Sequence, residues 1–316
     1  MTEIQITSGQ EKQRFDKFLK KYFKAASGGF LYKMLRKKNI TLNKKKADGS
    51  EILQAGDMIQ VFFSDETFSK MRGQEVVSSE YQKLLQVPHE LQVIYEDDLM
   101  LIVNKPSGML SQKASESDIS LNESILSYLI HEGLLSEETY AVFHPSVANR
   151  LDRNTSGIVL AGKTLAGQQF LSDILRDRSA KKIYHCIVRG KVEEEMHLKG
   201  YLLKDERSNQ VQIFSDETQD AKPIETAYRP LVVGPDATLL EVHLITGRSH
   251  QIRAHLASIG HPIAGDPKYG DMVWNKKLRQ DFSVRSQLLH AYSITLPDGR
   301  TFIADEPEIF SQIMRG

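Results

Sequence analysis

A polar turn with one aspartate between two arginines is the first candidate for chemistry in this sequence. The run Asn149-Arg150-Leu151-Asp152-Arg153 comes shortly before the apolar residues 158–161, so we expect a turn in front of a buried strand. Neighbouring cations favour the charged form of a carboxylate, and Asp152 would therefore stay ionised and able to act as a nucleophile at neutral pH. A salt-bridged turn without catalytic function is the alternative interpretation of the same residues.

A second polar cluster lies further along the chain, where residues 250–259 are predicted to form a helix. Arg248 precedes this helix, Arg253 lies one turn inside it, and Ser249 is positioned to cap its start. Two arginines and His250 near a helix N-terminus are suited to bind a phosphate or a carboxylate. An exposed basic helix end would have the same composition.

Periodicity and turn signals predict the elements that must position these two clusters. Strands are expected at residues 91–95, 99–103, 158–161, 183–188, 226–233, 238–245, 292–296 and 301–304. Helices are expected at residues 122–130, 165–175 and 250–259. Helices mixed with strands that short turns connect are typical of an α+β domain built on a mixed sheet.

Residues 157–164 match the phosphate-binding pattern G-x-x-x-x-G-K-[ST], but their surroundings argue against a nucleotide site. The apolar strand itself lies between Gly157 and Gly162, where the pattern needs a flexible loop, and its amides are expected to bond to neighbouring strands. No metal-binding spacing stands out either, since His250 and His255 are five residues apart and Cys186 lies alone in a predicted strand. We therefore expect no metal, nucleotide or other cofactor.

The composition is that of a soluble globular protein with about two domains. The chain has 316 residues, of which 40% are hydrophobic and 26% charged, and a single cysteine gives no reason to expect an oxidising compartment. The longest apolar run is far shorter than a membrane helix requires, and the N-terminus lacks the features of a signal peptide. The sequence therefore predicts a cytoplasmic protein without membrane contact.

The formal net charge of zero conceals an uneven distribution. Residues 1–63 contain 13 lysines and arginines against six acidic residues, so the remaining 253 residues carry an opposite excess of acid. Phe15, Phe18, Leu19 and Tyr22 follow the spacing of one helix face, and residues 30–38 predict a second short helix. Such cations suit a nucleic-acid backbone, although a solvated basic surface would also explain them. The candidates for RNA contact in this region are Arg14, Lys17, Lys33, Arg36, Lys37, Lys38, Lys44 and Lys45.

Residues 12–63 resemble the alpha-L RNA-binding module, also called the S-four domain. The resemblance rests on the runs Arg14-Phe-Asp16-Lys17-Phe-Leu19 and Ala55-Gly56-Asp57-Met-Ile, with the basic residues 33–43 between them. It implies a small N-terminal α/β RNA-binding domain over residues 1–63. Residues 64–87 are polar and weakly patterned, so we expect a linker there and a second domain over residues 88–316.

The second domain resembles the RluA-type pseudouridine synthases. The matching blocks are residues 93–108, Arg150-Leu-Asp152-Arg-Asn-Thr-Ser-Gly157, residues 240–256 with Thr246-Gly-Arg248-Ser-His250-Gln-Ile-Arg253, and residues 260–270. The branch that acts on large-subunit ribosomal RNA usually carries an alpha-L domain, so it fits best. The resemblance implies a mixed, mostly antiparallel sheet flanked by helices. Asn149 and Ser249 depart from the histidine and threonine that are commoner in the family at these positions.

The resemblance also implies an activity and a role for each site residue. Asp152 matches the essential catalytic aspartate, Tyr184 matches the tyrosine that packs on the target base, and Arg253 matches the arginine that pairs with the aspartate. Arg150, Arg248 and His250 would orient these groups or contact RNA. The implied reaction is the isomerisation of uridine to pseudouridine in RNA, most simply in 23S ribosomal RNA, with attack by Asp152 at ribose C1′ or at the base left open.

Three other functions are alternatives to this one: a transfer-RNA pseudouridine synthase, a non-catalytic RNA-binding factor for ribosome assembly and an RNA methyltransferase. A binding role needs none of Asp152, Tyr184 and Arg253, and no glycine-rich loop for a methyl donor is found in the sequence. RNA is therefore the expected partner, and a monomer is the default expectation for the oligomeric state.

Overall fold

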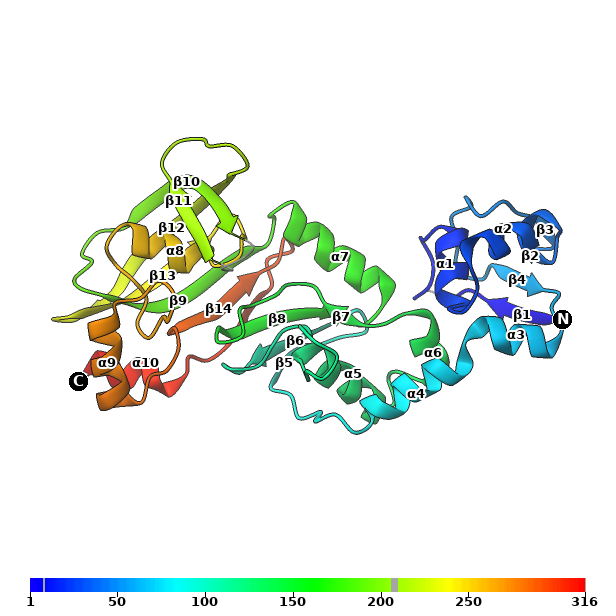
Figure 1. Ribbon diagram of the computed structural model, residues 1–316, viewed down its shortest axis with the longest axis horizontal. Helices are drawn as coiled ribbons and strands as arrows, with labels where there is room; N and C mark the ends of the chain where they lie inside the picture. Colours follow the sequence, from blue (N-terminus) through cyan, green and yellow to red (C-terminus); the bar gives the residue numbers. More distant parts are fainter. Residues whose placement is uncertain (8, 206–209, 316) are drawn as a thin grey trace.

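The computed structural model describes residues 1–7, 9–205 and 210–315. Within these residues the strands form one sheet of four strands and one of eleven. Figure 1 shows a small N-terminal part at one end of an elongated molecule and a larger part, with the C-terminus, at the other. The chain is an α+β protein whose large sheet is mixed and mostly antiparallel, which confirms the predicted fold class.

The N-terminal part is a small sheet covered by two short helices. Its elements are β1 (Thr2–Gln5), α1 (Phe15–Tyr22), α2 (Gly28–Arg36), β2 (Ile40–Leu42), β3 (Lys45–Lys46) and β4 (Met58–Val61), in the strand order β1-β4-β2-β3. The predicted apolar stripe of α1 is confirmed, because Phe15 and Phe18 are fully buried. α2 begins two residues earlier than predicted, since the Ser27 side chain accepts a hydrogen bond from the Phe30 amide and caps the helix.

Residues 64–87, expected to be a linker, are largely helical. α3 (Asp65–Arg72) and α4 (Gln74–Leu84) follow each other directly, and Gly73 between them adopts a left-handed φ of 65°. Phe68 of α3 packs against the core of the N-terminal part, whereas Val77 of α4 belongs to the core of the larger part. This segment therefore docks one helix on each part of the molecule (Figure 1).

The large sheet follows the order β11-β10-β12-β13-β9-β14-β8-β6-β5, with β15 paired to β14 and β7 to β8. The strands are β5 (Val93–Glu96), β6 (Met100–Lys105), β7 (Ser146–Val147), β8 (Ser156–Gly162), β9 (Lys181–Arg189), β10 (Met196–Asp205), β11 (Gln210–Phe214), β12 (Lys222–Val233), β13 (Ala237–Leu244), β14 (Leu289–Thr295) and β15 (Thr301–Ile303). The helices are α5 (Leu121–His131), α6 (Glu137–Val142), α7 (Leu165–Arg176), α8 (Gln251–Ser258), α9 (Met272–Phe282) and α10 (Glu308–Arg315).

Helices cover both faces of the large sheet, and β8, an interior strand between β14 and β6, is buried along its whole length. Successive side chains of a strand point to opposite faces, so Val159 belongs to the core that includes α5 and α8, while Leu160 belongs to the core under α7. α9 and α10 cover the second face further along, where Ile187 of β9 is buried. The polar turn before β8 is therefore attached to one of the most enclosed strands of the molecule.

Several elements escaped the sequence prediction, namely β1, β7, β10, β11, α6, α9 and α10. β11 and β1 are edge strands of their sheets, and Val211 is the one buried residue among the nine residues of these two strands. A short strand with a solvent-exposed face contains too few apolar residues to produce a clear alternation of apolar and polar positions.

Candidate active site

Asp152 lies in the turn that precedes β8, and hydrogen bonds hold this turn from both sides. The Ser111 hydroxyl donates to the Leu151 carbonyl at 3.0 Å and accepts from the Leu151 amide at 3.0 Å. The Thr155 amide donates to the Asp152 carbonyl at 3.0 Å. The side-chain amide of Asn149 donates to the Ile158 carbonyl and accepts from the Leu160 amide, so this residue, which departs from the family pattern, is bonded to β8. The carboxylate of Asp152 is thus carried by a fixed backbone.

The glycine that follows this turn is required by the sheet itself. Gly157 has a φ of +109°, and a Cβ atom at this position would lie 2.3 Å from the carbonyl oxygen of Ala291. This close approach occurs where β8 and β14 pair in parallel. The pattern match at residues 157–164 is therefore strand structure, and Lys163 bonds to Glu96 and to the Asp97 carbonyl instead of facing a phosphate site.

Lys105, at the end of β6, was not recognised as a candidate from the sequence. Its side chain is fully buried, and its ammonium donates to the carbonyls of Pro106 (3.0 Å), Met109 (2.8 Å) and Arg153 (3.0 Å). Burial lowers the pKa of Lys105 to about 8, while the charge of Asp152 acts in the opposite direction. The lysine ties the loop after β6 to the turn that carries Asp152. The sequence signal that could have identified Lys105 is a single lysine close behind an apolar run, because such a lysine is carried into the protein interior by the strand.

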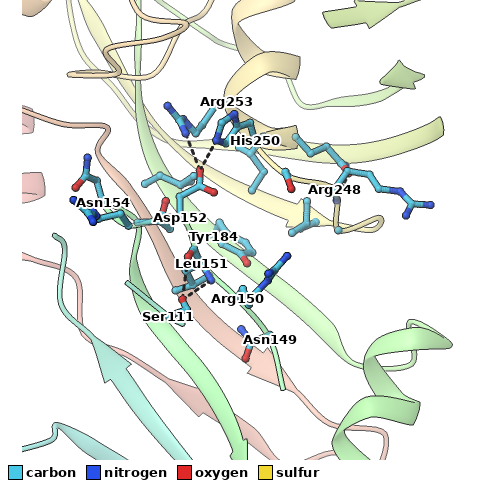
Figure 2. A pocket seen from close by; sticks show the side chains of 18 of the residues that line it. Ser111, Asn149, Arg150, Leu151, Asp152, Asn154, Tyr184, Arg248, His250 and Arg253 are labelled. Atoms are coloured by element: carbon cyan, nitrogen blue, oxygen red, sulfur yellow. Dashed lines mark hydrogen bonds and ion pairs between the residues drawn. The ribbon is translucent and has the colours of Figure 1, made fainter. Parts of the chain in front are cut away.

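Arg253 meets Asp152 across 101 residues of sequence, and its guanidinium is shared between two carboxylates. Nη1 donates to Oδ2 of Asp152 at 2.8 Å, while Nε and Nη2 bind Asp266 at 2.7 and 2.8 Å. Burial disfavours the charged guanidinium, but the bonds and charges of the two aspartates outweigh it and raise the pKa of Arg253. Figure 2 shows Arg253 and His250 converging on the Asp152 carboxylate.

Tyr184 stands on β9 beside the carboxylate, with 8% of its surface exposed. Burial raises the pKa of its hydroxyl, and the negative charge of Asp152 raises it further. The phenol therefore stays protonated at neutral pH. An aromatic face and a hydroxyl donor are presented together at the cavity wall.

His250 is the residue before α8, and its backbone adopts a left-handed φ of +56°. Its Nε2 lies 3.9 Å from Oδ2 of Asp152, and its Nδ1 lies 3.0 Å from the Tyr269 hydroxyl. Burial lowers the pKa of His250, which favours the neutral ring. The prediction that Ser249 caps this helix was wrong, because His250 is the N-cap residue and the Arg248 amide bonds instead to the Gln251 side chain.

A cavity of about 1000 Å³ opens over this cluster, and its charge is nearly all of one sign. Among the described residues that line it, Asp152 is the single acid, against ten lysines and arginines. Arg150 and Arg248 are exposed at the cavity, as expected for residues that could reach a ligand. The cations of this lining are Lys113, Arg150, Arg153, Arg176, Arg178, Lys182, Lys204, Arg248, Arg253 and Lys268. Six of them were missed, because nothing in the local sequence shows that they gather in one place.

The basic residues of the N-terminal part are placed on its surface. Lys17, Lys33, Arg36, Lys37, Lys38, Lys44 and Lys45 are all exposed. Arg14 differs from them, because its guanidinium donates to the carboxylate of Asp16 at 3.1 and 3.2 Å. These positions leave the first seven available to a polyanion.

Cys186 is fully buried on β9, and burial raises the pKa of its thiol, as expected for a structural residue. Across residues 1–7, 9–205 and 210–315, no cluster of three histidine, cysteine or acidic side chains is arranged to hold a metal ion. In the same ranges, none of the helices has the length and apolar character needed to cross a membrane.

Comparison with known proteins adds to this geometry. A family model described as RNA pseudouridylate synthase matches residues 99–258. The ribosomal large subunit pseudouridine synthases C of Haemophilus ducreyi and Escherichia coli are each 33% identical to this chain, over 94% and 92% of it and over 88% and 87% of their own lengths. The chain belongs to the RNA pseudouridylate synthase family. The solved structure of human RNA pseudouridylate synthase domain containing 4 has the same fold, with a TM-score of 0.57 at 19% identity over 76% of this chain and 96% of its own.

The chain is accordingly an RNA pseudouridine synthase, an isomerase. Its structure brings Asp152, Arg253 and His250 into direct contact and places Tyr184 beside them. Arg150 and Arg248 line the same cavity, but in the part of the chain that the structure describes they form no hydrogen bond or ion pair with the Asp152 carboxylate. Asp266 and Lys105 lie in blocks that resemble the family, but the sequence assigned them no role, and the structure shows that they hold this cluster from behind.

Proposed function

We propose that this synthase isomerises uridine to pseudouridine in large-subunit ribosomal RNA, with Asp152 as its essential catalytic residue. The observation that carries the proposal is the ion pair at 2.8 Å between Asp152 and the buried Arg253, in the wall of a cavity whose described lining contains ten lysines and arginines. The ribosomal substrate is supported by the relatives, which match nearly the whole chain and are named for the ribosomal large subunit.

The reaction balances without another reactant. The bond between uracil N1 and ribose C1′ breaks, a bond between C5 and C1′ forms, C5 gives up a proton, and N1 gains one. Asp152, kept ionised by Arg253, supplies the nucleophile or base that starts this exchange. No electron, methyl group or phosphate changes hands, so the stoichiometry asks for no cofactor.

Tyr184 supports the base while it turns. Its buried ring offers an aromatic face for uracil, and its protonated hydroxyl is placed to exchange a proton with a group on the base. A uridine in folded RNA must leave its stack to reach such a wall, as other base-modifying enzymes require. The proposal therefore includes extrusion of the target nucleotide into the cavity.

The remaining cations hold the RNA. Arg150 and Arg248 are exposed at the cavity and would contact phosphates on either side of the target nucleotide. The seven exposed lysines and arginines of the N-terminal part would bind a more distant stretch of backbone, and Arg14 would contribute least because Asp16 occupies it. The proposal retains the cytoplasmic location and the monomeric state expected from the sequence.

The test uses the protein alone with two unmodified transcripts, large-subunit ribosomal RNA and transfer RNA. Pseudouridine mapped chemically in the ribosomal transcript, with no donor or nucleotide added, is the expected result. Asp152→Asn should lower the rate by more than about 10⁴-fold, because the amide can neither attack nor accept a proton. Asp298→Asn, at an exposed aspartate outside the cavity, is the matched control. Product in transfer RNA alone would overturn the substrate, and an active Asp152→Asn would overturn the catalytic assignment.

A further inference from the structure

The block of residues 260–270 resembles the family, yet no part of the reaction has been assigned to it. The block connects α8 to α9, and it places Asp266 directly behind the arginine that holds the catalytic carboxylate. The Asp266 side chain is completely buried. Besides Arg253, its Oδ1 accepts hydrogen bonds from the amides of Lys268 at 2.8 Å and Tyr269 at 3.1 Å. Its position is thus fixed by the backbone of its own turn.

The backbone conformation of this turn also fixes the position of Asp266. Gly265 has a φ of +75°, and a Cβ atom there would lie 2.3 Å from the Ser286 carbonyl oxygen. The Asn275 side chain of α9 accepts from the Gly265 amide at 2.8 Å and donates to the Asp266 carbonyl at 2.9 Å. Glycine and asparagine together lock the chain on both sides of the buried aspartate.

Asp266 determines which nitrogen of Arg253 reaches Asp152. A guanidinium is a rigid planar fork, so a carboxylate bound to Nε and Nη2 fixes the direction of the remaining Nη1. That nitrogen lies 2.8 Å from Oδ2 of Asp152. The Tyr269 ring supports the same fork, since its centre is 5.3 Å from the guanidinium carbon.

Tyr269 orients His250 in a similar way to that in which Asp266 orients Arg253. The Val211 amide donates to the Tyr269 hydroxyl at 2.9 Å, and the hydroxyl oxygen lies 3.0 Å from Nδ1 of His250, to which it can donate its own proton. With Nδ1 as acceptor, the proton of a neutral ring sits on Nε2. Nε2 is the nitrogen that lies 3.9 Å from Oδ2 of Asp152, so the ring presents a donor toward the carboxylate.

We propose that Asp266 and Tyr269 are positioning residues for this reaction, which act through Arg253 and His250 respectively. Neither touches the substrate in this scheme. Asp266 aims the guanidinium, and Tyr269 selects the ring tautomer, so that an N–H group of each residue faces the same carboxylate oxygen, from 2.8 Å for Nη1 of Arg253 and from 3.9 Å for Nε2 of His250. The inference rests on the proposed role of Asp152, because it gives these two residues the task of orienting that carboxylate.

The first test separates turnover from binding. Asp266→Asn and Tyr269→Phe are measured in steady state on the ribosomal transcript, with Asp298→Asn and Tyr95→Phe as matched controls outside the cavity. Asp266→Asn loses a bond to a charged group, whereas Tyr269→Phe loses a bond to a neutral ring, so we expect kcat to fall about 100-fold for the first and about 10-fold for the second, with KM changed less than about threefold. An unchanged kcat in both variants, or a change confined to KM, would overturn the inference.

The second test needs no substrate. Ring nitrogens of ¹⁵N-labelled histidine are observed by NMR, and the His250 signals are assigned by their loss in His250→Gln. The wild type should show the proton on Nε2, and Tyr269→Phe should shift the spectrum toward a mixture of tautomers. An identical His250 spectrum in both proteins would refute the role of Tyr269. A wild type that forms no pseudouridine in any RNA would refute the proposed function instead, while the NMR result would still decide on Tyr269.

Discussion

The N-terminal part and the cavity are both rich in cations, but they hold them in opposite ways. Lys33, Arg36 and Lys37 stand exposed on and just after α2. Arg253 is only 5% exposed and is bonded to two carboxylates at once. Exposed cations add affinity for a polyanion roughly in proportion to their number, whereas one buried cation with a fixed direction can define the state of a single reacting group.

The sharpest test of this difference is to exchange arginine for lysine in each region. Arg253→Lys should lower kcat about 10²- to 10³-fold, because an ammonium cannot span Asp266 and Asp152 as the planar fork does. Arg36→Lys should leave kcat and KM within about twofold, since an exposed point charge serves a phosphate equally well. Steady-state rates on one transcript measure both variants, and thermal melting checks that Arg253→Lys is folded. Equal effects of the two exchanges would remove the distinction.

The next prediction addresses the exposed cations as a group. Replacing Lys33, Arg36, Lys37 and Lys38 together by glutamine should weaken RNA binding about 30-fold at low salt and flatten its salt dependence. The rate of the bound complex should not change, because these residues lie outside the cavity. Deletion of residues 1–63 is a poorer experiment, since Phe68 of α3 and Val142 of α6 pack against that core and would be uncovered. A fall in single-turnover rate with unchanged affinity would contradict the division of labour.

The same contrast explains which parts of the molecule the sequence could predict. The apolar stripe of α1, the buried strand β8 and the strand that contains Cys186 follow from local periodicity and are confirmed. The helices α3 and α4 were missed although Phe68 and Met71, and then Val77, Tyr81 and Leu84, have helical spacing. Gly73 divides the segment into two short helices, each with too few apolar residues to stand out.

The residues of the site could be predicted from the sequence only where they lie in recognisable motifs. Asp152 and Arg253 were candidates from their own polar clusters, but Tyr184 and the pairing of the two clusters came from resemblance, because an ion pair between residues 101 positions apart has no local signature. Asp266 lies in a recognised block, but its role depends on a turn whose backbone no spacing rule describes. The cations that line the cavity are spread along the sequence from Lys113, after β6, to Lys268, before α9. Only folding brings them together.

Histidine distribution gives the last and smallest difference between the two regions. All ten histidines lie at residue 89 or beyond, so the N-terminal part has none. His255 of α8 is 2% exposed, its Nδ1 lies 3.1 Å from the Thr226 hydroxyl, and burial lowers its pKa to about 4 from 6.5. Between these two values the unfolded chain binds the proton more tightly, so stability falls as the pH falls through this window.

We therefore expect acid to weaken the catalytic part selectively. From pH 7 to pH 5, His255 should cost the larger part about 1–2 kcal/mol of unfolding free energy. His255→Gln keeps a polar partner for Thr226 but cannot be protonated, so its stability should fall less over the same range. Urea unfolding followed by the fluorescence of Trp274, the single tryptophan, reports on the larger part, and His197→Gln at an exposed histidine is the control. Equal pH dependence in the wild type and His255→Gln would mean that His255 is hydrated and titrates normally, and the contrast would then rest on the arginines alone.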